Sequence, residues 1–256
     1  MFSDLTPHTY SILTQMGMFR TREKEGIRIC LRAPLALLLP PKNRIYRSLK
    51  WLLHAFDFFA NIFIDIRLGY IITSHLERSL EGRFREIDCP GEEETALINE
   101  SALNPVCRRD SRHFNWIMHN PWILTANPDI QKKKYPFSSF ARQFIQKWFR
   151  TGSEGKNEVL LMVSIRDRHL KVPYLFYKDE KDLHEAARLI FMLAAKHRVS
   201  LITTFHPVFS EVLTGSGGPV LLKRKIRRLT AVSGELSATT GEDFFLQDGD
   251  GDSVFT

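Results

Sequence analysis

The sequence predicts an α+β fold with a mixed sheet, and three observations in the second half of the chain carry this prediction. Three stretches rich in strand-forming residues, 137–150, 158–167 and 170–177, are separated only by short turn clusters, which is typical of an antiparallel meander. Residues 180–197 then repeat apolar side chains at helical spacing. The run "VSLITTF" at 199–205 is short, apolar and unbroken, as in a strand buried on both faces. A strand, a crossover helix and a further strand in this order form a right-handed parallel unit.

The stretch 137–150 fits two kinds of structure. Its aromatic residues are spaced as on a helix, but Phe and Trp are also good strand residues. The turn cluster "TGSEGKN" and the strand that follows it favour the strand interpretation. After Pro207 the sequence predicts a short helix and then two closing strands, in 219–232 and 244–256.

The N-terminal region predicts a short helix followed by a strand. Residues 6–17 form the helix, because Thr6 can cap it, Pro7 fits its first position and Gly17 can close it. The strand is "IRICLRA" at 27–33.

Two further helices are predicted ahead of the meander. Residues 91–103 carry three glutamates in the first turn, where the helix dipole favours acids. The second helix begins at a cap, Asp110 or Ser111, and ends at the pair Asn120-Pro121, because the residue before a proline avoids the helical conformation.

A longer helix is predicted at 49–72. Five charged or titratable residues interrupt it, so it does not read as a membrane-spanning segment. One face at helical spacing is apolar: Leu49, Leu52, Phe56, Phe59, Phe63 and Ile66. The first interpretation is that this face packs on the protein. The alternatives are a helix on a membrane surface, assisted by the basic residues of 42–50, and a helix that binds a partner protein.

Composition restricts the classes of function without selecting one. The net charge of +7 is compatible with nucleic acid, anionic lipid or an acidic ligand. Three cysteines without a CxxC pair favour a reducing compartment over a disulfide framework, and Met1 is followed by neither a basic start nor an apolar core. We therefore expect a cytoplasmic protein without a cleavable signal peptide.

Two charged motifs near the C-terminus have ordinary structural explanations. "QDGDGD" at 247–252 resembles the start of a calcium loop but lacks its glycine and its last glutamate, so we expect a hairpin turn. "KRKIRR" at 223–228 is a candidate phosphate or nucleic-acid patch, but an alternating strand with a solvated face is the simpler interpretation. The nine histidines show no zinc spacing, so no metal site is predicted. We expect no specific nucleic-acid partner.

The predicted order of elements resembles the C-terminal two-thirds of the GCN5-related N-acetyltransferase (GNAT) superfamily. "SLITTFHPVFSEVL" looks like that family's fifth strand and following helix, and "TPHTYSILTQMGM" is similar to the helix and turn that close such a domain. The resemblance implies three parts: 1–33 as the tail of an N-terminal acetyltransferase-like unit, 34–85 as a linker with an amphipathic helix, and 86–256 as a GNAT-like domain.

The acyl-donor loop of that family is altered in this chain. The resemblance places the family's Gly-rich, pyrophosphate-binding turn at "YKDEKDLHEA", which contains no glycine and has three carboxylates at the start of the helix, Asp179, Glu180 and Asp182. Carboxylates at a helix N-terminus occupy the positive end of the dipole and repel a diphosphate. The family's usual acid and base are also missing, so no catalytic residue is assigned. The candidate ligand-binding residues are Tyr177, Thr204 and His206, the last because ligands bind at strand ends in α/β layers.

The function expected from this resemblance is a degenerate acetyltransferase-like protein that binds a small molecule or supports a catalytic partner domain. One alternative is an active N-acyltransferase with an atypical donor loop, which would use acetyl-CoA. The other is an accessory protein that binds a membrane surface through residues 42–72.

Overall fold

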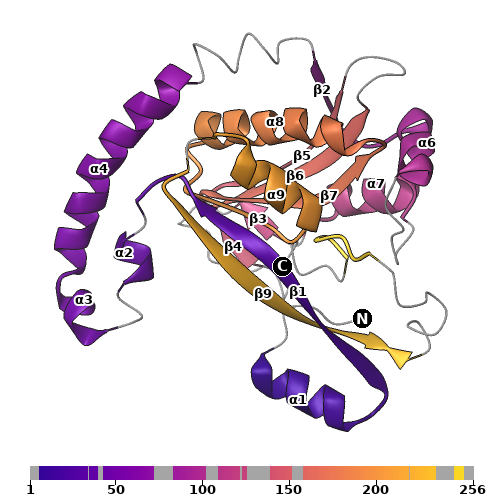
Figure 1. The fold of residues 1–256 in the computed structure, drawn as a ribbon, viewed down its shortest axis with the longest axis horizontal. Coiled ribbons are helices and arrows are strands. Elements are labelled where there is room, and N and C mark those ends of the chain that lie inside the picture. The colour runs from indigo at the N-terminus through magenta and orange to yellow at the C-terminus, as the bar shows by residue number, and fades with distance from the viewer. Residues whose placement is uncertain are drawn as a thin grey trace.

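The protein is described by a computed structural model, which covers residues 6–33, 35–39, 43–71, 83–101, 109–121, 123–125, 139–151, 158–218, 220–234 and 245–250. Its centre is a seven-stranded sheet in the order β2-β5-β6-β7-β8-β1-β9, beside a two-stranded sheet of β3 and β4 (Figure 1). The main strands are β1 (Phe19–Cys30), β2 (Phe84–Ile87), β5 (Phe144–Thr151), β6 (Val159–Arg166), β7 (His169–Tyr177), β8 (Leu201–Thr204) and β9 (Leu222–Ser233). The two strands of the small sheet are β3 (Ile123–Thr125) and β4 (Ser139–Ala141).

Helices lie on both sides of this sheet. They are α1 (Pro7–Gln15), α2 (Leu35–Leu38), α3 (Arg44–Ser48), α4 (Lys50–Ile71), α6 (Glu92–Glu100), α7 (Ser111–His119), η2 (Glu180–Asp182), α8 (Leu183–Lys196) and α9 (Pro207–Gly215). In the seven-stranded sheet β7 and β8 form a parallel pair, and every other neighbouring pair is antiparallel. The predicted α+β class with a mixed sheet is therefore confirmed.

The meander and its crossover are arranged as the sequence predicts. Strands β5, β6 and β7 pair in antiparallel order, and the turn between β6 and β7 places Asp167 and Arg168 at φ angles of 46° and 69°. The Asp167 carboxylate accepts the backbone N–H groups of Arg142 and Gln143, which ties the start of β5 to this turn. Helix α8 then crosses over to β8, all of whose residues are buried.

The N-terminal strand is longer than predicted and belongs to the same sheet. Strand β1 begins at Phe19 rather than near Ile27, and it lies between β8 and β9. The polar residues of its first half hid this length, because that part of the strand is only partly buried and carries no run of apolar residues. The origin of residues 1–33 as the tail of a preceding unit stays a prediction; in space, their strand joins the sheet formed by residues after 86.

The two faces of the sheet are covered differently. Helices α8 and α9 cover one face, and the main apolar core lies between them and β6, β7 and β8. On the other face, α6 and α7 cover part of β5–β7, where Phe114 packs edge-on against Trp148 and Tyr174 at ring-centroid distances of 4.9 and 5.0 Å. The rest of that face, toward β8, β1 and β9, carries polar and charged side chains.

The helix predicted at 49–72 is confirmed as α4, but the prediction that its apolar face packs on the protein is wrong. The residues predicted to pack on the protein are exposed, from 39% at Leu49 to 73% at Phe63. The opposite side of the helix faces the protein: Asp57 accepts the backbone N–H groups of Leu35 and Ala36, and Asn61 exchanges hydrogen bonds with the backbone of Ala33.

We call the exposed apolar side of this helix its outer face and the side turned to the protein its inner face. The outer face consists of Trp51, Leu52, Phe56, Phe58, Phe59, Ile62, Phe63, Ile66 and Tyr70. The inner face consists of Asp57, Asn61, Asp65 and the buried Leu68. Asp65 pairs with Arg32, with 2.7 Å between its Oδ1 and Nε. Polar contacts to residues 32–36, together with the buried Leu68, hold α4 on the protein.

Of the two closing strands, β9 is confirmed and the second is not. Residues 245–250 instead form an isolated bridge at Phe245 and a turn at Asp248–Asp250. The predicted turn is thus present, while the "SVF" part of the predicted hairpin lies outside the described residues. Unlike a surface hairpin, this segment is buried: Asp248 and Asp250 are 4% and 2% exposed.

A candidate anion-binding cavity

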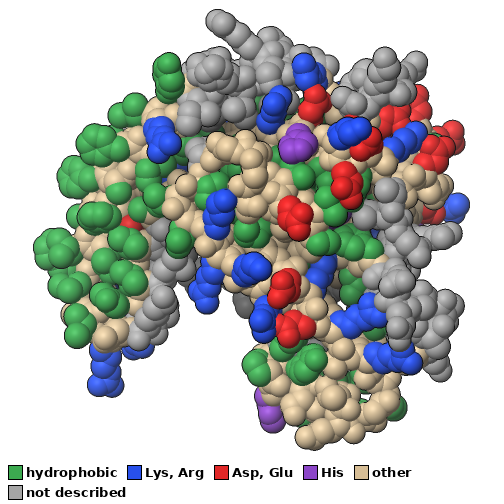
Figure 2. All heavy atoms as spheres, viewed as in Figure 1, with side chains coloured by type: hydrophobic (Ala, Val, Ile, Leu, Met, Phe, Trp, Pro, Cys, Tyr) green, Lys and Arg blue, Asp and Glu red, His purple; other side chains and the backbone are tan. Residues whose placement is uncertain are grey.

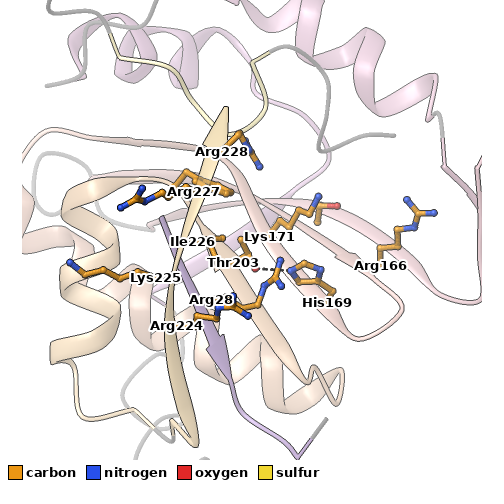
Figure 3. A pocket seen from close by; sticks show the side chains of 12 residues that line it. Arg28, Arg166, His169, Lys171, Thr203, Arg224, Lys225, Ile226, Arg227 and Arg228 are labelled. Carbon is orange, nitrogen blue, oxygen red and sulfur yellow. Dashed lines mark hydrogen bonds between the residues drawn. The ribbon is translucent and has the colours of Figure 1, made fainter. Parts of the chain in front are cut away.

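A cavity of about 830 Å³ lies on the sheet face that α8 and α9 do not cover (Figure 3). Seven of its lining residues are cationic: Arg28, Arg166, Lys171, Arg224, Lys225, Arg227 and Arg228. The described residues place no aspartate or glutamate in its lining. Such a lining favours an anionic ligand, because low-dielectric walls strengthen the field of charges of one sign.

The strand register explains why these cations lie together. Lys171 on β7 is opposite Thr203 on β8, Thr203 is opposite Arg28 on β1, and Arg28 is opposite Arg224 on β9. Side chains at paired positions project from the same face of a sheet. Three cations therefore stand in one row across four strands, and Figure 3 shows Arg28 and Arg224 beside His169 and Thr203.

This row is electrostatically unfavourable without a compensating charge. Like charges directly opposite each other on neighbouring strands destabilise a sheet, and Arg28 and Arg224 are such a pair. The buried Nε of Arg28 has no hydrogen-bond partner among the described residues. An anion placed between these side chains would both accept hydrogen bonds and reduce the repulsion.

Two other cations of the lining are already engaged. The Arg227 Nε lies 3.0 Å from a carboxylate oxygen of Glu23, and Figure 3 shows the Arg227 side chain pointing away from His169. Arg228 lies over the Phe205 ring, 3.9 Å from its centroid, and its Nη1 lies 3.9 Å from Asp248. The strand register places Lys171, Arg28 and Arg224 in one row, and this row is the candidate ligand-binding part of the cavity.

The pKa of His169 is affected by its place in this cationic cavity. The pKa of His169 is lowered to about 4, mainly by burial and in addition by the neighbouring Lys171 and Arg28. The ring is consequently neutral at pH 7, and its Nε2 lies 2.8 Å from the hydroxyl of Thr203. This hydrogen bond holds the ring at the floor of the cavity, next to the row of cations.

The three predicted ligand-binding residues lie together, but outside this cavity. Tyr177, Thr204 and His206 are 3%, 0% and 4% exposed, and the Tyr177 and His206 rings are 5.6 Å apart. His206 caps α9, since its Nδ1 accepts the backbone N–H of Phe209 at 3.2 Å. The pKa of His206 is lowered to about 4, mainly by burial and in addition by Lys24. Their role in binding stays a prediction.

The C-terminal segment 245–250 fills the space where β7 and β8 diverge. The two strands pair only from His169 to Lys171 and from Leu201 to Thr203. Beyond that point the side-chain amide of Gln247 takes the place of a neighbouring strand: its Oε1 accepts the N–H of Leu175, and its Nε2 donates to the carbonyl of Leu175, both at 3.1 Å.

Asp248 attaches the same segment to β8 and β1. Its Oδ2 accepts the backbone N–H of Phe205 at 2.9 Å, and its Oδ1 lies 3.3 Å from the Nζ of Lys24. Gly249 fits only because it lacks a side chain: a Cβ there would come within 2.4 Å of the Tyr174 ring. The backbone groups in the gap between β7 and β8 are thus already occupied by the chain itself.

The turn before α8 is an acid-capped helix start, as predicted. The Asp179 carboxylate accepts the N–H of Lys181 at 3.0 Å. Lys178 is held by two carboxylates, Glu100 at 2.8 Å and Glu158 at 2.9 Å, which raise its pKa. The positive end of this helix therefore faces the protein's own acids.

Neither a known protein-family model nor a curated protein matches this sequence. Within the part of the chain that the structure describes, no three His, Cys, Asp or Glu side chains gather as a metal site. No helix among the described residues is both long enough and apolar enough to cross a membrane.

Sequence reasoning found part of this cavity and missed the rest. "KRKIRR" was visible as a cationic strand, and the structure places it on β9, where Arg224 lies opposite Arg28 and lines the cavity (Figure 3). Arg28 on β1 and the β7 residues His169 and Lys171 were missed because they lie far from Arg224 in the sequence, and only the register brings them beside it. The signal available in the sequence was a basic residue at alternate positions of three predicted strands.

Proposed function

We propose that this chain is a non-catalytic, GNAT-like binding domain whose ligand is a small polyanion, held in the cationic cavity by Lys171, Arg28 and Arg224. The observation that carries the ligand class is the row of three cations across β7, β1 and β9. It deepens the expectation of a degenerate domain that binds a small molecule, because it assigns that molecule a charge and a place.

The GNAT-like part of the proposal is supported by the order of the elements. An antiparallel meander, a crossover helix, a parallel strand, a short helix and the first of the two closing strands follow one another as in the resemblance, whereas the described residues do not form its second closing strand. The loss of acyl transfer is supported by the acid-capped start of α8 and by residues 245–250, which occupy the gap between β7 and β8.

Phosphate groups suit the cavity because each carries up to about two negative charges and three acceptor oxygens. Arginine binds phosphate through two parallel hydrogen bonds, and Arg28 and Arg224 stand next to each other. A cavity of about 830 Å³ is within the usual range for small-molecule sites and has room for more than one phosphate. We therefore expect a ligand with two or three phosphate groups.

The test uses inorganic tripolyphosphate as the probe, at constant ionic strength. A ligand at about 100 times its dissociation constant stabilises the folded state by about 2.7 kcal/mol, which corresponds to several degrees in melting temperature. We expect this shift in the native protein and its loss in Arg224→Glu. Arg188→Glu is the matched control, because Arg188 is exposed on α8, on the other face of the sheet.

A second readout ties binding to the cavity rather than to general charge. A bound phosphate should raise the pKa of His169 from about 4 toward its ordinary value, since it offsets Lys171 and Arg28. The C–H resonances of the ring measure this directly. An equal shift in Arg188→Glu and Arg224→Glu, with no change at His169, would refute the cavity as the site.

Acetyl-CoA separates this proposal from an active acyltransferase, because it carries phosphates as well as an acyl group. We expect any stabilisation by acetyl-CoA to disappear in Arg224→Glu and to persist in Lys178→Glu. The opposite pattern, with loss in Lys178→Glu or Tyr177→Ala and retention in Arg224→Glu, would place the ligand at the turn before α8. The acyltransferase alternative would then replace the binding domain.

A further inference from the structure

The outer face of α4 is the largest group of exposed apolar side chains in the described part of the chain. Trp51, Phe58, Phe59, Phe63 and Tyr70 are each at least 63% exposed. Figure 2 shows these hydrophobic side chains together along the edge of the molecule that α4 forms. A large exposed apolar patch on a folded domain indicates a surface that contacts a membrane or another protein.

The inner face fixes the orientation of this patch. Asp57, Asn61 and Asp65 bond to the backbone of residues 33–36 and to Arg32, which is only 3% exposed. Rotating the helix to bury the outer face would break all of these contacts and leave the Arg32 guanidinium without its carboxylate. The helix is therefore held with its apolar side outward.

The charges around α4 suit an anionic surface. Both acids of the helix, Asp57 and Asp65, point inward, whereas Lys50 and Arg67 are exposed near its two ends. Arg44 on α3 adds an exposed cation at the N-terminal end. Trp51 and Tyr70 also stand at opposite ends, and both side chains combine an apolar ring with a polar atom, as is favoured at membrane interfaces.

We propose that α4 docks on an anionic lipid bilayer, lying in the plane of the headgroups with its outer face in the apolar boundary. A helix of 22 residues carries its apolar side along about 33 Å, which suits contact with an extended surface. Pairing with a second copy of the chain is less suitable. In a parallel arrangement Arg44 and Lys50 would meet their own copies, and in an antiparallel arrangement they would meet Arg67.

The test is co-sedimentation with vesicles of phosphatidylcholine alone and of phosphatidylcholine mixed equally with phosphatidylserine. We expect binding to the mixed vesicles and much weaker binding to the neutral ones. Phe63→Glu should weaken binding at least about tenfold, since it removes a buried Phe from the interface. Neutralising Arg44 or Lys50 should weaken binding to the mixed vesicles about fivefold for each charge.

Two controls keep the outcomes distinct. Trp116→Glu replaces another exposed aromatic, 57% exposed on α7, and should leave vesicle binding unchanged. Melting temperatures show that each variant is folded. Equal binding of native protein and Phe63→Glu would overturn the proposal. So would a dimer in light scattering that Phe63→Glu dissociates while native protein ignores the vesicles, because the occupant of the face would then be a second copy.

Discussion

Helices α8 and α4 are both amphipathic, yet they face the protein in opposite ways. In α8 the apolar side is buried: Leu183, Ala187 and Ile190 are completely enclosed, while Arg188 is exposed. In α4 the polar side contacts the protein and Phe59 and Phe63 are exposed. Helical periodicity therefore identifies an apolar face, but it does not show whether that face packs in the protein core or is exposed on the surface.

The difference lies in what each helix can contact. Helix α8 crosses from β7 to β8, so the chain connection itself lays it on a sheet of apolar residues. Helix α4 lies against residues 32–36, just after β1, where the nearby groups are backbone N–H groups at Leu35 and Ala36 and the guanidinium of Arg32. These groups need acceptors, and Asp57 and Asp65 supply them.

The largest effect that this comparison predicts is on α8. Ile190→Asp places an unpaired carboxylate in the main core, where Ile190 is 0% exposed. We expect a loss of more than about 4 kcal/mol in the free energy of unfolding, because neither solvent nor a cation can reach the charge. Urea denaturation followed by circular dichroism measures it. A loss below about 1 kcal/mol would show that α8 does not hold the core together.

The next effect concerns an aspartate buried more deeply than those of α4. Burial raises the pKa of Asp250 from 3.8 to about 6, which corresponds to about 3 kcal/mol of destabilisation once the carboxylate is ionised. The penalty is absent below about pH 4 and complete above about pH 6, because the folded state holds the proton more tightly than the unfolded state.

Asp250→Asn removes this charge, and its amide oxygen can still accept the N–H of Gln247. We expect the variant to match the native protein near pH 4 and to be more stable by about 1 to 3 kcal/mol near pH 7.5. Buried His169 and His206 change stability in the opposite direction as pH falls, but they contribute equally to both proteins. A difference that does not vary with pH would contradict the assignment to Asp250.

The helices and strands could be predicted from the sequence, but most contacts between distant segments could not. Local patterns gave the meander, α8, β8 and α9, because each reports the chain's own periodicity and caps. The inward aspartates of α4 were not predictable, since their partners lie 21 to 33 residues away. The cavity could not be predicted because it depends on the register of four strands. The burial of residues 245–250 could not be predicted because it depends on where β7 and β8 stop pairing.

A smaller effect is expected on the inner face of α4. Asp65→Ala removes the carboxylate from Arg32, whose side chain is 4% exposed, whereas the Asp65 side chain is 40% exposed. Solvent already screens that side of the pair, so we expect a loss of about 1 to 2 kcal/mol. Asp88→Ala, at an exposed position before α6, is the matched control and should change little. Equal melting temperatures for the two variants would show that α4 is not held by its polar side.

The smallest effect is expected for Phe59→Asp, which makes on α4 the same kind of change as Ile190→Asp on α8. Phe59 is 63% exposed, so the new charge stays in water and no core contact is lost. Asp and Phe also have similar helix propensities. The free energy of unfolding should therefore change by less than about 0.5 kcal/mol, as is usual for surface substitutions. A loss above about 1 kcal/mol would mean that the outer face is covered in the isolated protein, and the contrast between the two helices would then fail.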